Sequence, residues 1–482
     1  MRTSRGMAAL GAVGVLALGL AACSPGTGGN GGATAPAGGD TAAPTTAEPT
    51  GETEPTGETT PDTEPTGEDT QPTGSTTVTF RLWDDVAAPA YEESFDAFTA
   101  QNPDINVEVE LVSWGDYWTR LPLDLQSGDM ADIFWTNSSN FARFADAGNL
   151  INITEALGDD HDEWTQSVVD LYTRDGSLWG VPQLWDSIAL FYNKDLTDAA
   201  GVDPTNLKFL PATERGPDAD TLIDAAQALT LDAAGRTPAD EGFDPNTREQ
   251  YGFNAQLDLQ AIYLDFLAQT GATFQDEDNN FAFNSPEGVL AFQYIYDLIN
   301  TWHVAPSAAE TNTNGDFSRE LFLQGKMGLF QSGPYSLKMI ADNADFEWGI
   351  APMVEGPEGR ISVVHGVAAV GNANSENMDA TLRVLEWLGS AEGQNAIATQ
   401  GVSFPGAVEA QQGFVDYWAA EGVDVQPFID AAEGTTQMAP VGPEVNAGLN
   451  EYTPYLQDML LGNISVEDAV NQAVEEGNAA MN

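Results

Sequence analysis

Apolar and polar positions alternate along the first part of the chain in the way that strands and helices require. The segment 105–112 (INVEVELV) places an apolar residue at every second position, which predicts a strand with one buried face. Apolar runs at 78–83 and 132–135 predict two further strands. Between these strands, aromatic and aliphatic residues recur at helical spacing, and the first such helix ends before Pro103. Strands that alternate with helices predict βαβ units and a parallel sheet.

Helical patterns dominate the rest of the chain. Ser465 and Asp468 form a predicted capping box at the start of the last helix. The roughly 400 residues beyond residue 76 are too many for one hydrophobic core, so we expect an α/β fold with two lobes. The expected helices lie at 221–229, 258–270, 286–300, 317–324, 378–389, 443–461 and 466–477, and the expected strands lie near 327–331 and 363–370.

The N-terminus has the pattern of a secretory signal peptide. Arg2 and Arg5 precede an apolar run, 7–22, which is shorter than the ~20 residues of a comfortable membrane span. Cys23, the one cysteine of the chain, follows directly. Residues 24–76 contain no aromatic residue and no Val, Ile, Leu or Met, so we expect them to be disordered. A GxGxxG pattern inside this segment has no predicted strand before it and no predicted helix after it, so we interpret it as linker.

Charge and cysteine content exclude several classes of function. The chain has 16 basic and 74 acidic residues and a formal net charge of -58, which would repel nucleic acid and anionic lipid surfaces. A single cysteine forms no internal disulfide and no cysteine cluster for a metal. Asp276, Asp278, Asn280 and Glu287 have the spacing of a calcium loop, but Phe281 stands where such a loop needs glycine. We therefore expect no calcium site there, and no metal or other cofactor.

Four stretches occur in an order that resembles a known family. They are LWGVPQLWDSIALFYNKDL (178–196), LFLQGKMGLFQSGPYSL (321–337), FEWGIAPMVEGPEGRISVVHGVAAV (346–370) and VLEWLGSAEGQNAIATQGVSFPG (384–406). Together they resemble the family 1 extracellular solute-binding proteins of carbohydrate ABC transporters, which are similar to maltose-binding protein. The resemblance covers essentially all of 77–482. It implies a two-lobed periplasmic-binding-protein type II fold with hinge crossovers and a central ligand cleft.

The resemblance also implies how the chain is divided. The small residues before Cys23 resemble a lipobox, so acyl chains on Cys23 would anchor the exported protein to the cell membrane, facing outside the cytoplasm. The expected division is a signal peptide at 1–22, the lipidated cysteine and its tether at 23–76, lobe one at 77–187 and 366–425, and lobe two at 188–365 and 426–482.

A cleft that binds sugar needs two kinds of side chain. Aromatic rings stack on the C–H faces of a sugar, while carboxylates and amides bind its hydroxyls. In open α/β sheets such ligands lie beyond the carboxyl ends of strands, where the sequence places Trp135 and Asn137. The expected ligand-binding residues are Asp85, Trp135, Asn137, Trp185, Asp186, Asn254, Gln256, Tyr335 and His365. The alternatives are helix-end stabilisation for Asp85, core packing for Trp135 and Tyr335, and a structural role for His365.

Several of these expectations rest on the resemblance. It implies that Asp186 lies where the family places a ligand carboxylate and that Tyr335 replaces a tryptophan found in many relatives. It also implies ligand contacts near Asn254 and Gln256, and a surface hairpin at 276–287. The sequence shows no cluster of Lys or Arg for a phosphate or carboxylate, which favours a neutral solute.

The sequence therefore predicts a membrane-anchored, monomeric receptor that captures a sugar and delivers it to the permease subunits of an ABC importer. It predicts no enzymatic activity, because no G-x-S-x-G or H-E-x-x-H motif occurs. Two alternatives stay open. The same fold could bind a polyol, glycerol phosphate, peptide or polyamine, or paired carboxylates could make a secreted glycoside hydrolase.

Overall fold

The structure is a computed structural model that describes residues 75–211 and 220–482. These residues belong to one compact unit, Thr70–Asn482. The predicted signal peptide, Cys23 and all but the last two residues of the predicted tether lie outside the described residues. Among the helices of the described part, none is both long and apolar enough to cross a membrane.

The first sheet contains the strands that the alternating patterns predict. Its order is β13-β6-β12-β3-β1-β2, with β14 also paired to β12. The parallel pairing of β1 with β2 runs from Thr76 opposite Ile105 to Leu82 opposite Leu111, which confirms the predicted strand and the parallel arrangement there. The predicted buried face is present only at the start of β2, because Ile105 is buried whereas Leu111 is exposed. In contrast, β12 is antiparallel to both β3 and β6, so the sheet is mixed. The strands are β1 (Thr76–Leu82), β2 (Ile105–Leu111), β3 (Ile133–Asn137), β6 (Val181–Asp186), β12 (Ile361–Gly371), β13 (Phe404–Pro405) and β14 (Thr435–Met438).

The second sheet has five strands in the order β11-β7-β10-β9-β8. The chain passes from the first sheet to the second through Ser187 and Ile188 alone, which join β6 to β7. A separate hairpin pairs two short strands, β4 (Thr173–Arg174) and β5 (Ser177–Leu178). The strands of the second sheet are β7 (Ala189–Asn193), β8 (Leu231–Asp232), β9 (Arg248–Phe253), β10 (Met327–Ser332) and β11 (Trp348–Pro352). Two sheets joined by short crossings match the predicted fold class.

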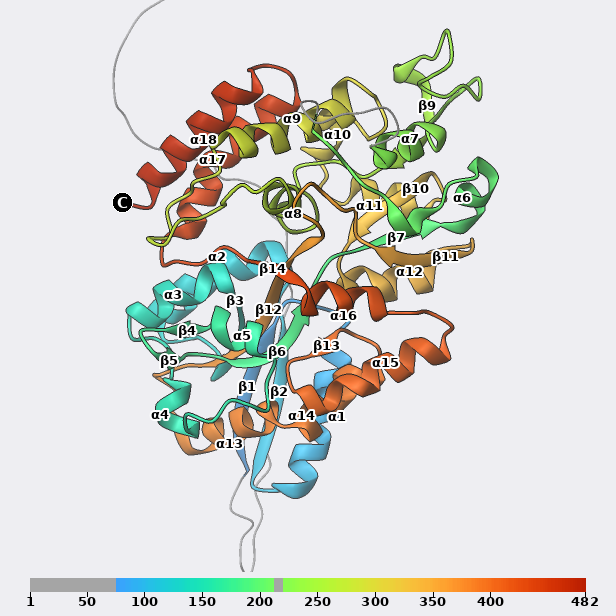
Figure 1. Cartoon of the computed structure of the whole chain (residues 1–482). Coiled ribbons are helices and arrows are strands. Elements are labelled where there is room, and N and C mark those ends of the chain that lie inside the picture. Colours follow the sequence, from blue (N-terminus) through green and yellow to red (C-terminus); the bar gives the residue numbers. More distant parts are fainter. Residues whose placement is uncertain (1–74, 212–219) are drawn as a thin grey trace, which may run out of the picture. The chain divides into compact units, whose positions relative to one another are not determined.

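Helices surround each sheet (Figure 1). Those grouped with the first sheet are α1 (Ala88–Gln101), α2 (Trp114–Ser127), α3 (Ser138–Asp146), α4 (Ile153–Leu157), α5 (Gln166–Leu171), α13 (Met378–Gly389), α14 (Ala391–Thr399) and α15 (Gln411–Ala420). The others are α6 (Lys194–Ala200), α7 (Thr221–Ala228), the π-helix η3 (Leu259–Tyr263), α8 (Leu264–Gln269), α9 (Pro286–Asn300), α10 (Ala308–Thr311), α11 (Phe317–Leu323), α12 (Leu337–Asn343), α16 (Gln426–Glu433), α17 (Val445–Leu460) and α18 (Val466–Ala480).

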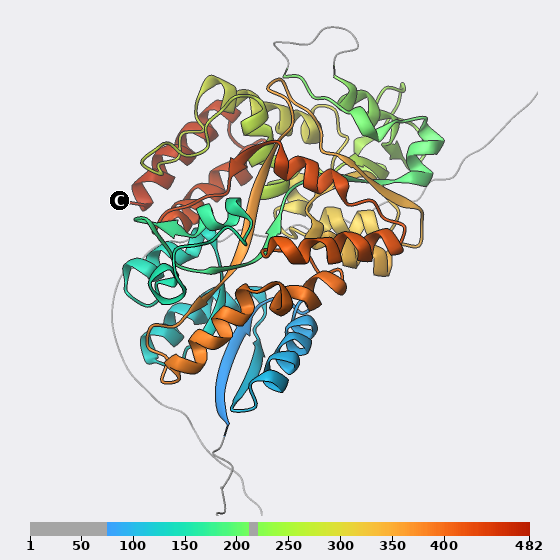
Figure 2. The same cartoon turned by 60° about the horizontal axis from the view of Figure 1, so that its bottom comes forward.

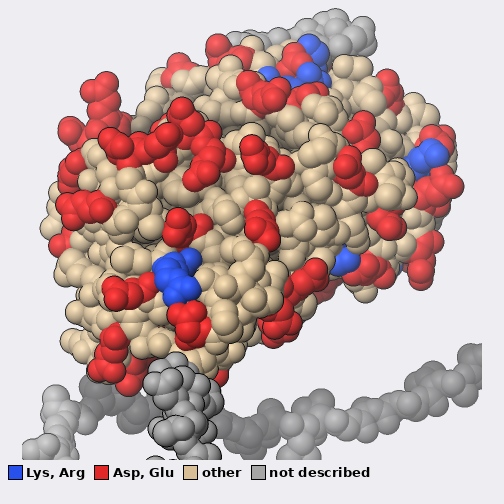
Figure 3. Space-filling model, turned by 90° about the horizontal axis from the view of Figure 1, so that it is seen from below, with Lys and Arg blue, Asp and Glu red and all other residues tan. Residues whose placement is uncertain are grey.

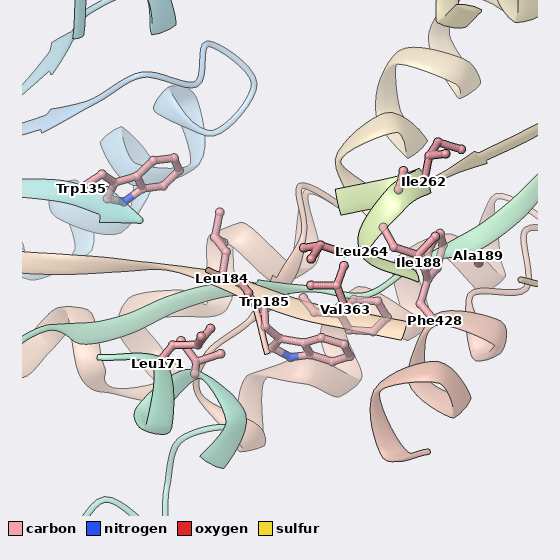
Figure 4. Close-up of a cluster of buried hydrophobic side chains, with 14 of the residues drawn as sticks. Trp135, Leu171, Leu184, Trp185, Ile188, Ala189, Ile262, Leu264, Val363 and Phe428 are labelled. Carbon is pink, nitrogen blue, oxygen red and sulfur yellow. The ribbon is translucent and has the colours of Figure 1, made fainter. Parts of the chain in front are cut away.

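The long strand β12 connects the two groups of elements (Figures 1 and 2). Its first residues lie beside α8, α16 and β14, and its last residues pair with β3. Buried hydrophobic side chains follow the same path, from Trp135 in the first sheet past Trp185 and Val363 to Phe428 (Figure 4). The crossing region is therefore packed as densely as a core, and this packing fixes the position of one sheet relative to the other.

Two local predictions can be compared with the structure in detail. The surface hairpin predicted at 276–287 is confirmed in its first part, because Gln275 and Phe281 form an antiparallel bridge and Asn279 turns the chain at a φ of 63°. The helix predicted at 258–270 is confirmed in extent, and its first part is the π-helix η3, which continues as α8 from Leu264. The side chain of Asp258 accepts hydrogen bonds from the first backbone N–H groups of η3, which fixes where this helix starts.

Candidate functional site

A cavity of about 520 Å³ lies where elements of both groups meet. The helices α2 and α3 and the last residue of β3, Asn137, form one side. The helices η3 and α17 and the segment before α17 form the other. His365 and Gly366 of β12 line the cavity between these two sides. A space of this size holds a small organic ligand and can bury most of its surface.

The aromatic part of the wall comes from one face of α2. Trp114 and Trp118 are four residues apart, so their side chains lie on the same side of the helix, and their ring centroids are 5.3 Å apart. Trp83 packs edge-on against Trp114 at 5.3 Å. Trp114 keeps 54% of its surface exposed, which is unusual for so large an apolar side chain. It therefore offers a supported, accessible aromatic surface to a ligand.

Amide side chains form a connected hydrogen-bond network beside these rings. Asn140 Nδ2 donates to Asn137 Oδ1 at 2.7 Å, next to the carboxyl end of β3. From the opposite side of the cavity, Asn446 Nδ2 donates to Asn140 Oδ1 at 2.6 Å and to the carbonyl of Ser139 at 3.0 Å. Ser138 Oγ also donates to the carbonyl of Pro440 at 3.0 Å. These bonds join the two sides of the cavity directly.

Asp186 and His365 form a buried pair at the crossing. They are register partners of β6 and β12, with Asp186 Oδ2 3.6 Å from His365 Nδ1. Burial raises the pKa of Asp186 to about 7, although Ser403 Oγ donates to its Oδ1. Burial also lowers the pKa of His365 to about 4. Both groups are therefore neutral over a range of mildly acidic pH, and the pair is not an ion pair there.

The sequence of this chain matches the model of the family described as bacterial extracellular solute-binding protein over residues 84–395. The chain belongs to the bacterial extracellular solute-binding protein family. The members of this family are binding proteins, and a cavity enclosed by elements of two lobes is the feature that such a protein needs.

Known proteins similar to this solute-binding protein include solved structures. This chain is 46% identical in sequence to UspC of M. tuberculosis, with a TM-score of 0.70, and the match covers 84% of this chain and 100% of that chain. The substrate-binding protein Lmo0181 of Listeria monocytogenes, solved in complex with cycloalternan, is 21% identical with a TM-score of 0.72, covering 84% of this chain and 99% of that one. A maltooligosaccharide ABC transporter solute-binding lipoprotein of Streptococcus pneumoniae is 22% identical over 74% of this chain and 77% of its own length.

The structure brings four of the expected ligand-binding residues of this solute-binding protein close together. Asn137 and His365 line the cavity. Asp186 lies behind His365, and the ring centroid of Tyr335 is 6.2 Å from that of His365. Tyr335 is 39% exposed, so its ring remains accessible beside the cavity.

The two expected tryptophans lie in the core instead of on the cavity wall. Trp135 is 1% exposed and packs against Trp83, with ring centroids 5.0 Å apart. Trp185 is buried against Phe404 in a stacked arrangement at 4.3 Å. Both rings therefore support the layer beneath the cavity.

The remaining expected residues have other partners. Asn254 is buried and exchanges hydrogen bonds with the backbone of Gln331, which holds β9 beside β10. The amide of Gln256 donates to the carbonyl of Gly315. Asp85 is exposed and is not among the cavity residues, while Asp84 caps the turn before α1.

Several cavity residues of this solute-binding protein have no counterpart among the expected ones. They include Trp118, Arg143, Asp258, Gln260, Asn446 and Asn450. Trp118 could have been found from the sequence, because the spacing of Trp114 and Trp118 places two tryptophans on one face of a predicted helix. Nothing local in the sequence indicates that α17 approaches α3, about 300 residues earlier in the chain.

Proposed function

We propose that this solute-binding protein captures a carbohydrate in the cavity between its two lobes and presents it to the permease of an ABC importer. The observation that carries the proposal is the combination of an accessible tryptophan, Trp114, with the amide network of Asn137, Asn140 and Asn446 in one cavity. A ring and a set of donors and acceptors are what the two surfaces of a sugar need. The relatives from Listeria and Streptococcus, whose names refer to cycloalternan and maltooligosaccharide, support the same choice.

We further infer that the protein is exported as a monomer and held at the membrane by acyl chains on Cys23. The proposed lobes are 77–187 with 366–425, and 188–365 with 426–482, and the proposed tether is 24–76. Two or three acyl chains give stable anchoring, whereas one chain gives marginal binding. Replacing Cys23 by serine should release the protein from the membrane fraction. Retention of Cys23→Ser at the membrane would contradict the anchor without affecting the proposed sugar site.

Hydrolysis of glycosides is not favoured by the cavity. Most glycoside hydrolases place two carboxylic acids on either side of the bond that breaks. Among the described residues that line the cavity, Asp258 is the one carboxylic acid. We therefore propose binding without turnover, and a hydrolysis assay with aryl-glycosides should show none.

A thermal-shift panel of mono- and oligosaccharides tests sugar capture. A sugar present at about 100 times its dissociation constant adds roughly 2.7 kcal/mol to the free energy of unfolding, which raises the melting temperature by a few degrees. Trp114→Ala should reduce this shift. Leu123→Ala is the matched control, because Leu123 is exposed on the same helix but does not line the cavity. A panel in which polyols or peptides give the shift, and carbohydrates give none, would contradict the proposal.

A further inference from the structure

Arg143 of α3 lines the cavity without an acidic partner. Arginines elsewhere in the described part commonly pair with a carboxylate at short distance, as Arg174 does with Asp146 at 2.6 Å and Arg383 with Asp104 at 2.7 Å. No carboxylate of the described residues lies within 4.0 Å of the Arg143 guanidinium. Arg248 also lacks a carboxylate partner, but its guanidinium donates to the backbone carbonyls of Pro245, His303 and Ala305, whereas Arg143 lines the cavity.

The contacts of Arg143 leave much of its hydrogen-bonding capacity unused. Its Nη2 donates to Asn140 Oδ1 at 3.2 Å, and its guanidinium carbon lies 4.5 Å from the ring centroid of Phe144. Its Nε is buried and has no hydrogen-bond partner among the described residues. Burial lowers the pKa of Arg143, which means that the charged form lacks the stabilisation that a paired arginine receives. A guanidinium held in place by an aromatic ring and an amide is well suited to bind an anion.

The other charged groups near the cavity do not supply that anion. Glu444, just before α17, interacts with Arg143 only at longer range and is exposed to solvent. Asp258 lies on the η3 side of the cavity, where its Oδ1 accepts hydrogen bonds from the backbone N–H groups of Gln260 and Ala261. On the face that Figure 3 shows, acidic side chains are spread over the surface and few basic ones lie between them. Among the described residues that line the cavity, Arg143 is the one Lys or Arg, so an anionic solute would meet its positive charge there.

We propose that Arg143 binds an acidic group on the captured sugar, so that the preferred solute is an anionic carbohydrate. This inference rests on the proposed function, and it replaces the neutral solute that the sequence favours. The acidic group is a carboxylate, sulfate or phosphate attached to the sugar ring. It accepts hydrogen bonds from the guanidinium, while Trp114 and the amide network contact the rest of the sugar.

Titration calorimetry with matched sugar pairs tests the inference on the purified full-length protein. The pairs are digalacturonate with galactobiose, glucose 6-phosphate with glucose, and glucose 6-sulfate with glucose. We expect the acidic member of at least one pair to bind about tenfold more tightly than its neutral partner, because a hydrogen bond to a charged group is stronger than one to a neutral group. The pair that shows this preference identifies the acidic group.

The variant Arg143→Gln should remove that preference, so that the acidic and neutral members of the pair bind with similar affinity. Arg174→Gln is the control, because Arg174 pairs with Asp146 and does not line the cavity. Equal affinities within every pair, or a preference that survives in Arg143→Gln, would overturn the inference while sugar capture stands. Absence of binding by every sugar of both classes would overturn both proposals.

Discussion

The buried pair of Asp186 and His365 predicts a pH dependence of stability that two substitutions should separate. In the unfolded chain both groups are charged near pH 5, because their usual pKa values are 3.8 and 6.5. In the folded protein burial moves these values to about 7 and about 4, so both groups are neutral at the same pH. The pair therefore binds nearly the same number of protons folded and unfolded, and it adds little pH dependence to the wild-type protein.

Replacing one residue of the pair removes the pH dependence of stability that this residue supplies. As the pH falls from 7 to 4, folded Asp186 takes up its proton before the unfolded chain does, so the wild type should gain about 3 kcal/mol over Asp186→Asn. Over the same interval the unfolded chain protonates His365 while the folded protein does not. The wild type should therefore lose about 3 kcal/mol relative to His365→Gln. The two differences have opposite signs.

Urea denaturation followed by tryptophan fluorescence at pH 4, 5, 6 and 7 measures these differences in the free energy of unfolding. The double variant Asp186→Asn/His365→Gln is the control and should follow the wild-type pH profile closely. If Asp186 and His365 formed an ion pair, the pKa of Asp186 would be lowered and the wild type would gain nothing over Asp186→Asn on acidification. That result, or differences that do not vary with pH, would refute the reasoning.

Three further substitutions give measurable outcomes. Asn446→Ala removes two hydrogen bonds across the cavity, each worth about 1 kcal/mol. Bound sugar should therefore dissociate about 5 to 30 times faster in a stopped-flow experiment. An unchanged dissociation rate would show that these bonds do not hold the lobes together. Trp114→Ala should weaken sugar binding about tenfold by calorimetry, and full affinity would exclude stacking on this ring. Gly333→Ala would place a Cβ 2.2 Å from the Tyr335 ring and should lower the free energy of unfolding by about 1–3 kcal/mol in urea, whereas Gly315→Ala, with nothing within 4 Å, should change it by less than about 0.5 kcal/mol.

Much of the fold could be predicted because its signals are local. The alternation in 105–112 indicates a strand, and the structure contains it as β2, paired in parallel with β1. The start of α18 follows from Ser465, whose Oγ accepts a hydrogen bond from the backbone N–H of Asp468. Such features need only a few neighbouring residues, so the sequence indicates them without knowledge of tertiary contacts.

The site could be predicted only in part, because its side chains are sorted by contacts between distant segments. Trp135 and Asn137 lie two residues apart at the end of β3, so their side chains point to the same face of the sheet. Even so, the ring of Trp135 is buried against Trp83, while the amide of Asn137 reaches the cavity. The amide of Asn254 is used to satisfy the backbone of Gln331, as buried polar groups require. Asn446 reaches the cavity only because α17 packs against α3. Residue type and spacing do not determine these arrangements.

Titration calorimetry of the purified protein with the carbohydrate that gives the largest thermal shift tests the central claim most directly. Wild-type protein and the variant Trp114→Ala/Asn446→Ala are compared, because these two residues contribute to the cavity from opposite sides. We predict one sugar bound per chain and an affinity at least tenfold weaker in the double variant. Binding of the sugar with undiminished affinity by the double variant would contradict capture in this cavity.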